Sequence, residues 1–309
     1  MDKKLKKSCP KCSEGSIKAY NSNIRRLYKM YSGKKKIKTL KDIPETSKWL
    51  MSKKLEDLYK NFAFNIRRNL SASAFIATKM YGLKPTNKWN KLMLSDAKEY
   101  ETNRAKNKKS EHEEENIPKD GLKGLVKATK QYKTQIRRTL NSKPTLAGLY
   151  KYQLFLSLKF MTSDTPLRND LVTLNVEKEG PKINYLKKKK NTFFIVMNTF
   201  KNSDRIGSKE IKLSRANSMQ LKKFLKYRGD LVDHDYLFSL KNGDKMTKKA
   251  FSAALIKVTN DLLGKRIGSR LIRIMFATSQ KELLEKSDKV SHDMLHNPKQ
   301  TREYVRKND

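Results

Sequence analysis

Apolar residues recur at helical spacing through the N-terminal third of the chain. The clearest stripes run over residues 17–31, 55–70 and 72–80. An apolar residue at every third or fourth position places these side chains on one face of a helix. The pattern therefore predicts a group of amphipathic helices, preceded by a basic, flexible leader over residues 1–15.

The pattern changes over residues 100–119, where glutamate, lysine and asparagine replace nearly all apolar residues. A proline and a glycine lie at the end of this stretch. A polar segment that ends in such residues is typical of a linker. We therefore expect a helical domain over residues 16–115 and a second domain over residues 116–309.

The second predicted domain mixes helical and strand patterns. Residues 122–136 and 146–160 have helical spacing, and the second stretch is apolar nearly all round, which is typical of a buried helix. Residues 183–213 hold runs rich in β-branched and aromatic residues, which predict a small antiparallel sheet. Helical patterns return after residue 219. The expected fold class is α+β and mostly helical.

Charge is the strongest signal in the composition. The 309 residues carry 71 lysines and arginines against 31 acidic residues, for a net charge of +40. A field of this sign attracts polyanions, and nucleic acid is the first candidate partner. A lysine-rich composition without such a partner is the alternative. The longest apolar runs fall short of the ~18 residues of a membrane span. We therefore expect an intracellular protein that associates with nucleic acid and has no membrane partner, in the cytoplasm or nucleus of a host cell.

The two cysteines, Cys9 and Cys12, have the spacing of half a zinc ribbon. One such pair cannot complete a tetrahedral zinc site, and two cysteines cannot form a disulfide framework. Three interpretations remain: a metal site shared across a dimer, a redox pair, and an inert surface pair, which we favour.

Candidate chemistry is concentrated towards the C-terminus. Arg270 and Arg273 fall on one face of a predicted helix, and His296 and Tyr304 follow. Guanidinium groups match phosphate oxygens in a bidentate fork, and a tyrosine held beside them could attack phosphorus. Upstream, Arg168 follows a proline that predicts a helix start, where an anion is favoured.

These residues belong to longer motifs. Residues 270–278 read Arg-Leu-Ile-Arg-Ile-Met-Phe-Ala-Thr, His296 lies in Met-Leu-His-Asn, and Tyr304 ends Thr-Arg-Glu-Tyr. Arg168 lies in Leu-Arg-Asn-Asp-Leu, and Lys201 lies in Phe-Lys-Asn beside the predicted hairpin. This order resembles the catalytic domain of the tyrosine recombinases, the phage-integrase family. The resemblance covers about residues 117–309, and the N-terminal region fits the family's DNA-clamping core-binding domain only in length and type.

The resemblance implies a site-specific recombinase of a viral or mobile element. Such an enzyme works on double-stranded DNA as a homotetramer, without a metal or another cofactor. Tyr304 would be the nucleophile that forms a 3′-phosphotyrosine link, and Lys201 the general acid. Arg168, Arg273 and His296 would stabilise charge on the phosphate oxygens.

Three positions depart from the family's pattern. Arg270 and Ile274 stand where histidines are common, and Asp170 follows the first arginine by two positions where the usual acid follows by three. Arg270 therefore has two interpretations: an active-site residue that contacts phosphate, which we favour, and a structural residue. His292 and Lys209 compete for the roles of His296 and Lys201. Two other functions stay open: a type IB topoisomerase-like or telomere-resolving enzyme, and a non-catalytic DNA-binding protein.

Overall fold

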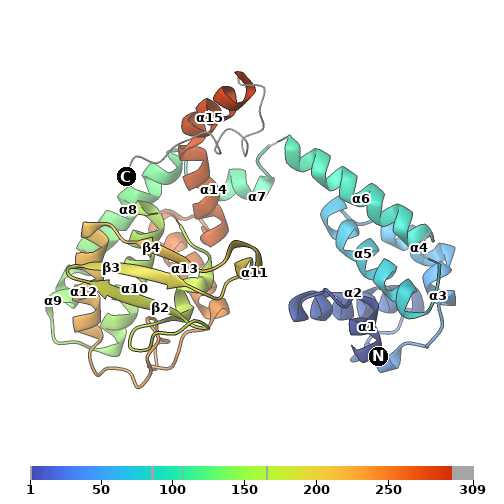
Figure 1. Ribbon diagram of the computed structural model, residues 1–309, viewed down its shortest axis with the longest axis horizontal. Helices are drawn as coiled ribbons and strands as arrows, with labels where there is room; N and C mark the ends of the chain where they lie inside the picture. Colours follow the sequence, from blue (N-terminus) through green and yellow to red (C-terminus); the bar gives the residue numbers. More distant parts are fainter. Residues whose placement is uncertain (1, 85–86, 107, 165, 294–309) are drawn as a thin grey trace. The chain divides into compact units, whose positions relative to one another are not determined.

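The chain divides into two units, each with its own hydrophobic core. The computed structural model describes residues 2–84, 87–106, 108–164 and 166–293 (Figure 1). The first unit covers Met1–Lys108 and the second Lys109–Asp309, and each is described by itself. None of the helices in the described ranges is long and apolar enough to cross a membrane.

The secondary structure of the first unit, over its described residues, consists of helices. Its helices are α1 (Asp2–Ser8), α2 (Glu14–Ser32), the 3-10 helix η1 (Leu40–Asp42), α3 (Lys48–Met51), α4 (Lys53–Lys60), α5 (Phe64–Met80) and α6 (Lys88–Ala105). Helix α5 contacts α1, α2, α4 and α6, so it is the centre of this unit. The apolar stripes of the sequence supply the core, which includes the fully buried Leu27, Leu55 and Trp89.

The first residues of the chain do not form the leader that we expected. Residues Asp2–Ser8 form helix α1, and its one leucine, Leu5, is fully buried. Helix α1 contacts α5 and α2, while Lys4, Lys6 and Lys7 are left at the surface. Cys9 and Cys12 form a disulfide just before α2 begins. The prediction failed because a single apolar residue among lysines gives no periodic signal.

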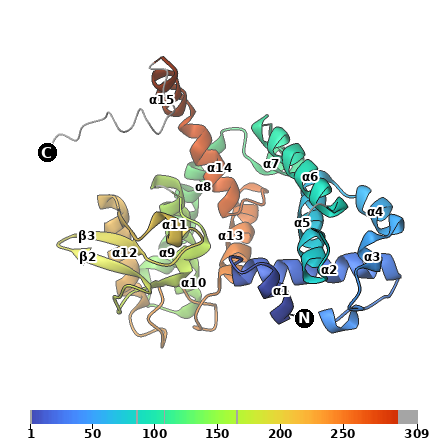
Figure 2. The same cartoon turned by 45° about the vertical axis from the view of Figure 1, so that its right-hand side comes forward.

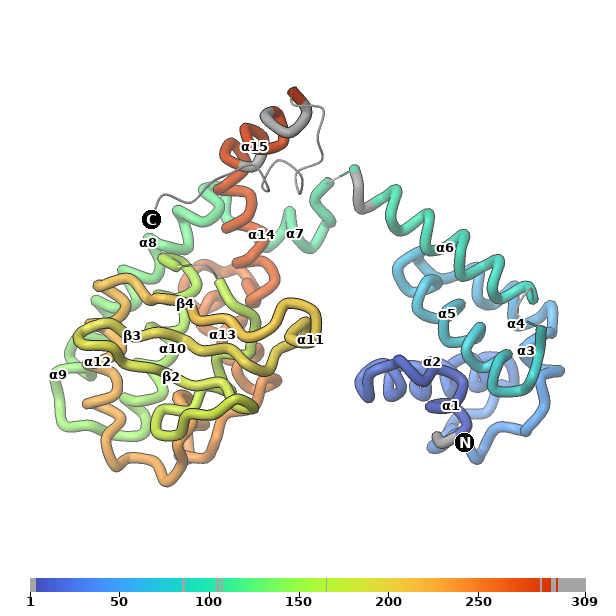
Figure 3. The backbone as a smooth tube through the Cα atoms, in the orientation of Figure 1, coloured from blue at the N-terminus to red at the C-terminus, as the bar shows by residue number. Residues whose placement is uncertain are grey.

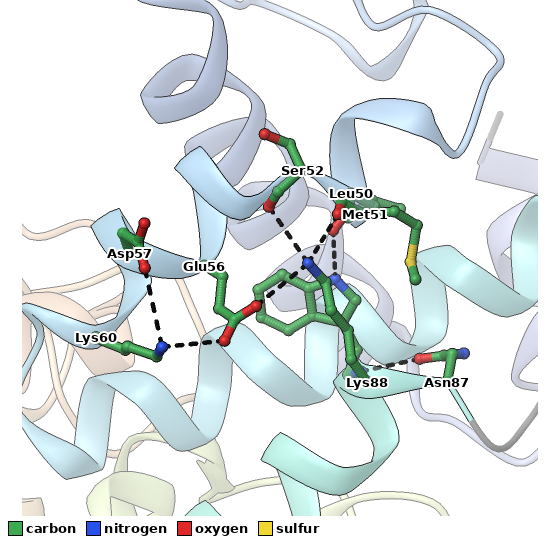
Figure 4. Close-up of polar contacts among 9 residues, drawn as sticks. Leu50, Met51, Ser52, Glu56, Asp57, Lys60, Asn87 and Lys88 are labelled. Atoms are coloured by element: carbon green, nitrogen blue, oxygen red, sulfur yellow. Dashed lines mark hydrogen bonds and ion pairs between the residues drawn. The ribbon is translucent and has the colours of Figure 1, made fainter.

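The start of α6 is hydrogen-bonded to the C-terminal end of α3. Lys88 Nζ donates to the carbonyl of Met51 at 2.9 Å, and Trp89 Nε1 donates to that of Leu50 at 2.7 Å (Figure 4). Glu56 forms ion pairs with two lysines. Its Oε1 lies 3.0 Å from Lys60 Nζ, and its Oε2 lies 3.5 Å from Lys88 Nζ. These bonds satisfy carbonyls that the short helix α3 leaves without partners.

The second unit surrounds one buried helix, α10 (Leu146–Ser163), as its apolar sequence predicted. Helix α10 contacts α8 (Gly121–Gln135), α12 (Arg215–Arg228), α13 (Lys248–Leu263) and α14 (Ser269–Ser279). The remaining helices of the unit are α7 (Glu111–Asn116), α9 (Arg137–Asn141), the 3-10 helix η2 (Asn169–Thr173), α11 (Ser203–Ile206) and α15 (Lys281–Asp293).

The sheet of the second unit has four strands in the order β1-β2-β3-β4. They are β1 (Leu174–Asn175), β2 (Asn184–Lys189), β3 (Thr192–Met197) and β4 (Lys209–Lys212). The pairs β2–β3 and β3–β4 are antiparallel, as predicted, whereas β1 pairs parallel with β2. The sheet is therefore mixed, and the mostly helical α+β class is confirmed. Helix α12 packs against β3.

The acidic stretch that suggested a linker is largely helical. Helix α6 continues to Ala105, and α7 occupies Glu111–Asn116. Along the chain, the boundary between the two units falls between Lys108 and Lys109, whereas we expected it at residue 116. The polar composition led to a wrong prediction of a linker. Helix α7 contacts the rest of its own unit through charged and amide groups, and in sequence such residues look the same as those of a solvated segment.

A buried carboxylate lies between helices of the first unit. Asp96 of α6 is 5% exposed, and its Oδ2 accepts hydrogen bonds from the hydroxyls of Tyr59 and Ser71. Arg67 lies 3.5 Å from the other oxygen but also pairs with Glu99. Burial raises the pKa of Asp96 from 3.8 to about 6, and the negative charge of Glu99 adds to the shift. The folded unit therefore binds this proton more tightly than the unfolded chain.

Asp96→Asn should remove a pH dependence from the stability of the first unit. The contribution of Asp96 is complete below pH 3.8 and is lost as the pH rises through about 6. Relative to Asp96→Asn, the wild-type free energy of unfolding should fall by about 2–3 kcal/mol between pH 4 and pH 7. Denaturant titrations followed by tryptophan fluorescence measure it, because the two tryptophans, Trp49 and Trp89, lie in this unit. Asp57→Asn, at an exposed position, is the control. If the difference in free energy of unfolding between wild type and Asp96→Asn did not change with pH, the raised pKa of Asp96 would be contradicted.

Candidate active site

The first candidate residue, Arg168, precedes η2 on an extended backbone with φ −73° and ψ −176°. We predicted that Pro166 would start a helix with Arg168 in its first turn, but residues 166–168 are not helical and η2 begins at Asn169. The buried side chains of Leu171 and Val172 anchor η2 in the core. The fold therefore fixes the backbone at Arg168 and leaves its side chain exposed.

Helix α14 carries the other two arginines. Leu271, Ile272 and Met275 are buried and attach one face of the helix to the core. Arg270 is exposed, whereas Arg273, one turn later, is half-buried and its Nε donates to the carbonyl of Ser269 at 3.2 Å. The prediction of a helix carrying both arginines is confirmed. Figure 2 shows α15 continuing from α14, with a break at Gln280 between them.

The three arginines form one positive cluster around Arg273. Burial lowers the pKa of the Arg273 guanidinium, and the positive charges of Arg168 and Arg270 lower it further, while Asp170 opposes the shift. An arginine stays protonated at neutral pH despite such a shift. The fold therefore brings Arg168, just before η2, within electrostatic reach of the arginines of α14. Such crowding of like charges is unfavourable unless an anion or acidic side chain compensates.

Two buried carboxylates compensate part of this charge. Asp170 is 8% exposed and forms an ion pair with Lys248, the first residue of α13. Glu113 of α7 is also buried, and its Oε1 lies 2.8 Å from Arg270 Nη2. No pattern in the sequence pointed to Lys248, and Glu113 lay in the stretch that we expected to be a linker. A signal for Glu113 did exist, since Ser110-x-x-Glu113 is the pattern of a capping box.

Lys201 lies in the connection between β3 and β4, which also carries α11 (Figure 3). Its side chain is exposed. Asn184 fixes the start of this connection, because its Oδ1 accepts from the backbone N–H groups of Asn198 and Thr199, both at 2.8 Å.

His296 and Tyr304 lie outside the described residues, and the competing His292 belongs to α15. The structure therefore brings together Arg168, Arg270 and Arg273 among the candidate residues. Such a cluster can bind an oxyanion through several charge-assisted hydrogen bonds. Among the residues that the structure describes, no group of three or more His, Cys, Asp or Glu side chains could hold a metal ion.

Comparisons of sequence find no relative, since neither a protein-family model nor a curated protein matches the chain. Comparisons of structure find similar proteins. The chain is similar to the site-specific recombinase XerH in a pre-cleavage complex with its difH substrate. The TM-score is 0.54 and the sequence identity 14%, and the match covers 94% of this chain and 77% of the XerH chain. The post-cleavage complex of XerH with a palindromic difH substrate gives a TM-score of 0.52 and 14% identity over 95% and 76%. The chain has the tyrosine-recombinase fold.

Inorganic phosphate should stabilise the second unit by binding the arginine cluster. A ligand that binds only the folded state raises its stability in proportion to the logarithm of ligand concentration. We expect Arg273→Gln to reduce the phosphate-dependent rise in melting temperature by more than half, because it removes the central guanidinium. Differential scanning calorimetry in phosphate and in chloride at equal ionic strength measures this rise. The control is Arg137→Gln, at an exposed position in α9. Equal losses in both variants would contradict a specific site.

Proposed function

We propose that this protein is a DNA strand-transfer enzyme that cleaves and rejoins DNA through a 3′-phosphotyrosine intermediate. The observation that carries the proposal is the cluster of Arg168, which precedes η2, with Arg270 and Arg273 of α14, in a tyrosine-recombinase fold. An isolated arginine cluster is unfavourable in a fold, whereas a scissile phosphate would neutralise it and be held in place.

Each proposed step uses a group of this chain. The hydroxyl oxygen of Tyr304 attacks phosphorus, the Tyr304 O–P bond forms and the P–O5′ bond breaks. The phenol proton passes to water, and nearby guanidinium groups favour this loss and stabilise charge on the non-bridging oxygens. Lys201 supplies a proton to the leaving 5′ oxygen, and His296 donates a hydrogen bond to the phosphate. Attack of a 5′ hydroxyl on the phosphotyrosine reverses these steps and joins the strands.

The first unit would hold the DNA duplex, as the proposed clamping domain. The net charge of +40 supports a polyanionic partner. In this unit, the guanidinium of Arg26 lies 4.7 Å from the ring centre of Phe62, and that of Arg68 lies 4.3 Å from the ring centre of Tyr100. Both arginines line one surface hollow between α2, α5 and α6. Arginines held in this way are preorganised for contact with phosphate groups.

The biological role that we propose is integration or excision of a viral or mobile element, by a homotetramer acting on two DNA sites. A topoisomerase-like or telomere-resolving enzyme would use the same chemistry on one DNA site. Strand exchange between two specific sites supports the recombinase, and relaxation of supercoiled plasmid without a specific site supports the topoisomerase-like alternative.

Wild-type protein should form a covalent adduct with a nicked suicide substrate that carries its cognate site. The nick lets the short 5′ fragment diffuse away, so the phosphotyrosine cannot be reversed. We expect Tyr304→Phe to abolish the adduct, since phenylalanine has no nucleophilic oxygen, and to retain DNA affinity. Denaturing gels measure the adduct, and peptide mass spectrometry locates it. The terminal repeats of the element supply the candidate site. An adduct with Tyr304→Phe, or none with wild type on any terminal repeat, would refute the proposal.

Lys201→Ala should slow cleavage of an ordinary substrate about 100-fold or more, the usual contribution of a general acid. A substrate with sulfur in place of the bridging 5′ oxygen should restore the rate, because a thiolate leaves without protonation. Single-turnover rates on both substrates separate this role from a structural one. Lys209→Ala is the matched control, since Lys209 is an exposed lysine in the adjacent strand β4. Restoration for Lys209→Ala but not for Lys201→Ala would transfer the role to Lys209.

A further inference from the structure

Glu113 is a buried acid that the proposed chemistry does not use. Its side chain is 11% exposed, while that of its partner Arg270 is 71% exposed. The two carboxylate oxygens have separate partners: Oε1 lies 2.8 Å from Arg270 Nη2, and Oε2 accepts from the backbone N–H of Ser110 at 3.0 Å. The second bond belongs to the capping box at the start of α7. A fixed acid thus holds one end of an otherwise exposed guanidinium.

Two more contacts fasten the same helix to the turn before α14. Asn116 Oδ1 accepts from the backbone N–H of Arg266 at 2.8 Å, and Lys265 Nζ donates to the carbonyl of Glu115 at 2.5 Å. Helix α7 is the first element after the boundary between the units. The position of Arg270 beside Arg273 therefore depends on the segment that enters the second unit.

A guanidinium has five N–H donors in a planar fork. Glu113 engages Nη2 of Arg270, and the high exposure of the side chain leaves the rest of the fork accessible to a ligand. A long side chain on a helix surface otherwise samples many rotamers, and fixing it before binding removes that entropic cost. The arrangement is thus suited to presenting Arg270 to a phosphate.

We propose that Glu113 is a positioning residue that holds the Arg270 guanidinium beside Arg273, so that both arginines grip one phosphate group. The inference rests on the proposed function for the identity of its substrate, a DNA phosphate. It gives Arg270 a phosphate contact in the place where the family's pattern has histidine, and it makes α7 part of the site's support.

The test is Glu113→Gln, with Glu114→Gln as the matched control on the exposed side of the same helix. Glutamine keeps the volume and an oxygen for the Ser110 N–H, but it loses the charge that holds Arg270. If charge alone mattered, both variants would bind inorganic phosphate more tightly, because each removes one negative charge. Positioning predicts that Glu113→Gln weakens phosphate binding about tenfold, the contribution of a charge-assisted contact. Calorimetric titration measures both affinities.

A double-mutant cycle with Arg270→Gln separates positioning from a general effect on folding. Glu113→Gln should cause no further loss of phosphate affinity once Arg270 is removed, because it acts through that residue. Additive losses would overturn the inference, as would a Glu113→Gln variant that binds phosphate as tightly as Glu114→Gln. Glu113→Asp keeps the buried charge but shortens its reach by one methylene, and it serves the same comparison if Glu113→Gln does not fold.

Cleavage of the suicide substrate distinguishes this inference from the proposed function. Glu113→Gln should lower the single-turnover rate about tenfold or more, as expected for a misplaced catalytic group, while DNA affinity stays unchanged. Equal rates in Glu113→Gln and wild type would overturn the inference and leave the proposed function intact. A wild type that binds phosphate in this Glu113-dependent way but forms no adduct would refute the function alone.

Discussion

The crowding of positive charge around Arg273 is the constraint on which the second unit's candidate site depends. Arg168 and Arg270 both act on its half-buried guanidinium, and their mutual repulsion opposes folding. Apolar burial on the opposite face of α14 offsets this cost, since Leu271, Ile272 and Met275 lie in the core. A site that is electrostatically unfavourable when empty is well suited to an anion, which removes the repulsion when it binds.

The acids around the cluster are placed so that they moderate the charge without filling the site. Asp170 is turned towards Lys248 of α13, and Glu113 holds the outer end of Arg270. Arg273 is left with a hydrogen bond to the backbone carbonyl of Ser269. If an acid instead formed a bidentate pair with Arg273, it would occupy the donors that a phosphate needs.

The frame that holds these groups is built from elements far apart in sequence. Helix η2 packs against α13, and α14 packs against both α8 and α10. Each arginine therefore has backbone anchored in a close-packed core, where small displacements are costly. The exposed side chains of Arg168 and Arg270 remain accessible to a ligand, while their backbone positions are fixed.

Periodic patterns in the sequence were enough to predict the helices of the first unit and the mostly helical α+β class of the second. They also predicted the buried helix α10, the strands β2 to β4 and the helix that carries Arg270 and Arg273. These features follow from periodicity, which is a local property of the chain. The sequence also supplied the order of motifs that resembles the tyrosine recombinases, and the structural comparisons confirm that fold. The assignments of Lys201, His296 and Tyr304 to the reaction stay predictions from the sequence.

The roles of the polar segments became clear from the long-range contacts of the fold. The fold turned the expected leader into a helix anchored by Leu5, and it moved Glu113 from a linker into contact with Arg270. It also brought Arg168 to Arg273 across a long stretch of chain. The sequence could not predict these contacts, because the local pattern around a charged residue is the same whether the residue is solvated or forms an ion pair. Its partner is fixed by long-range packing, which no periodic pattern encodes.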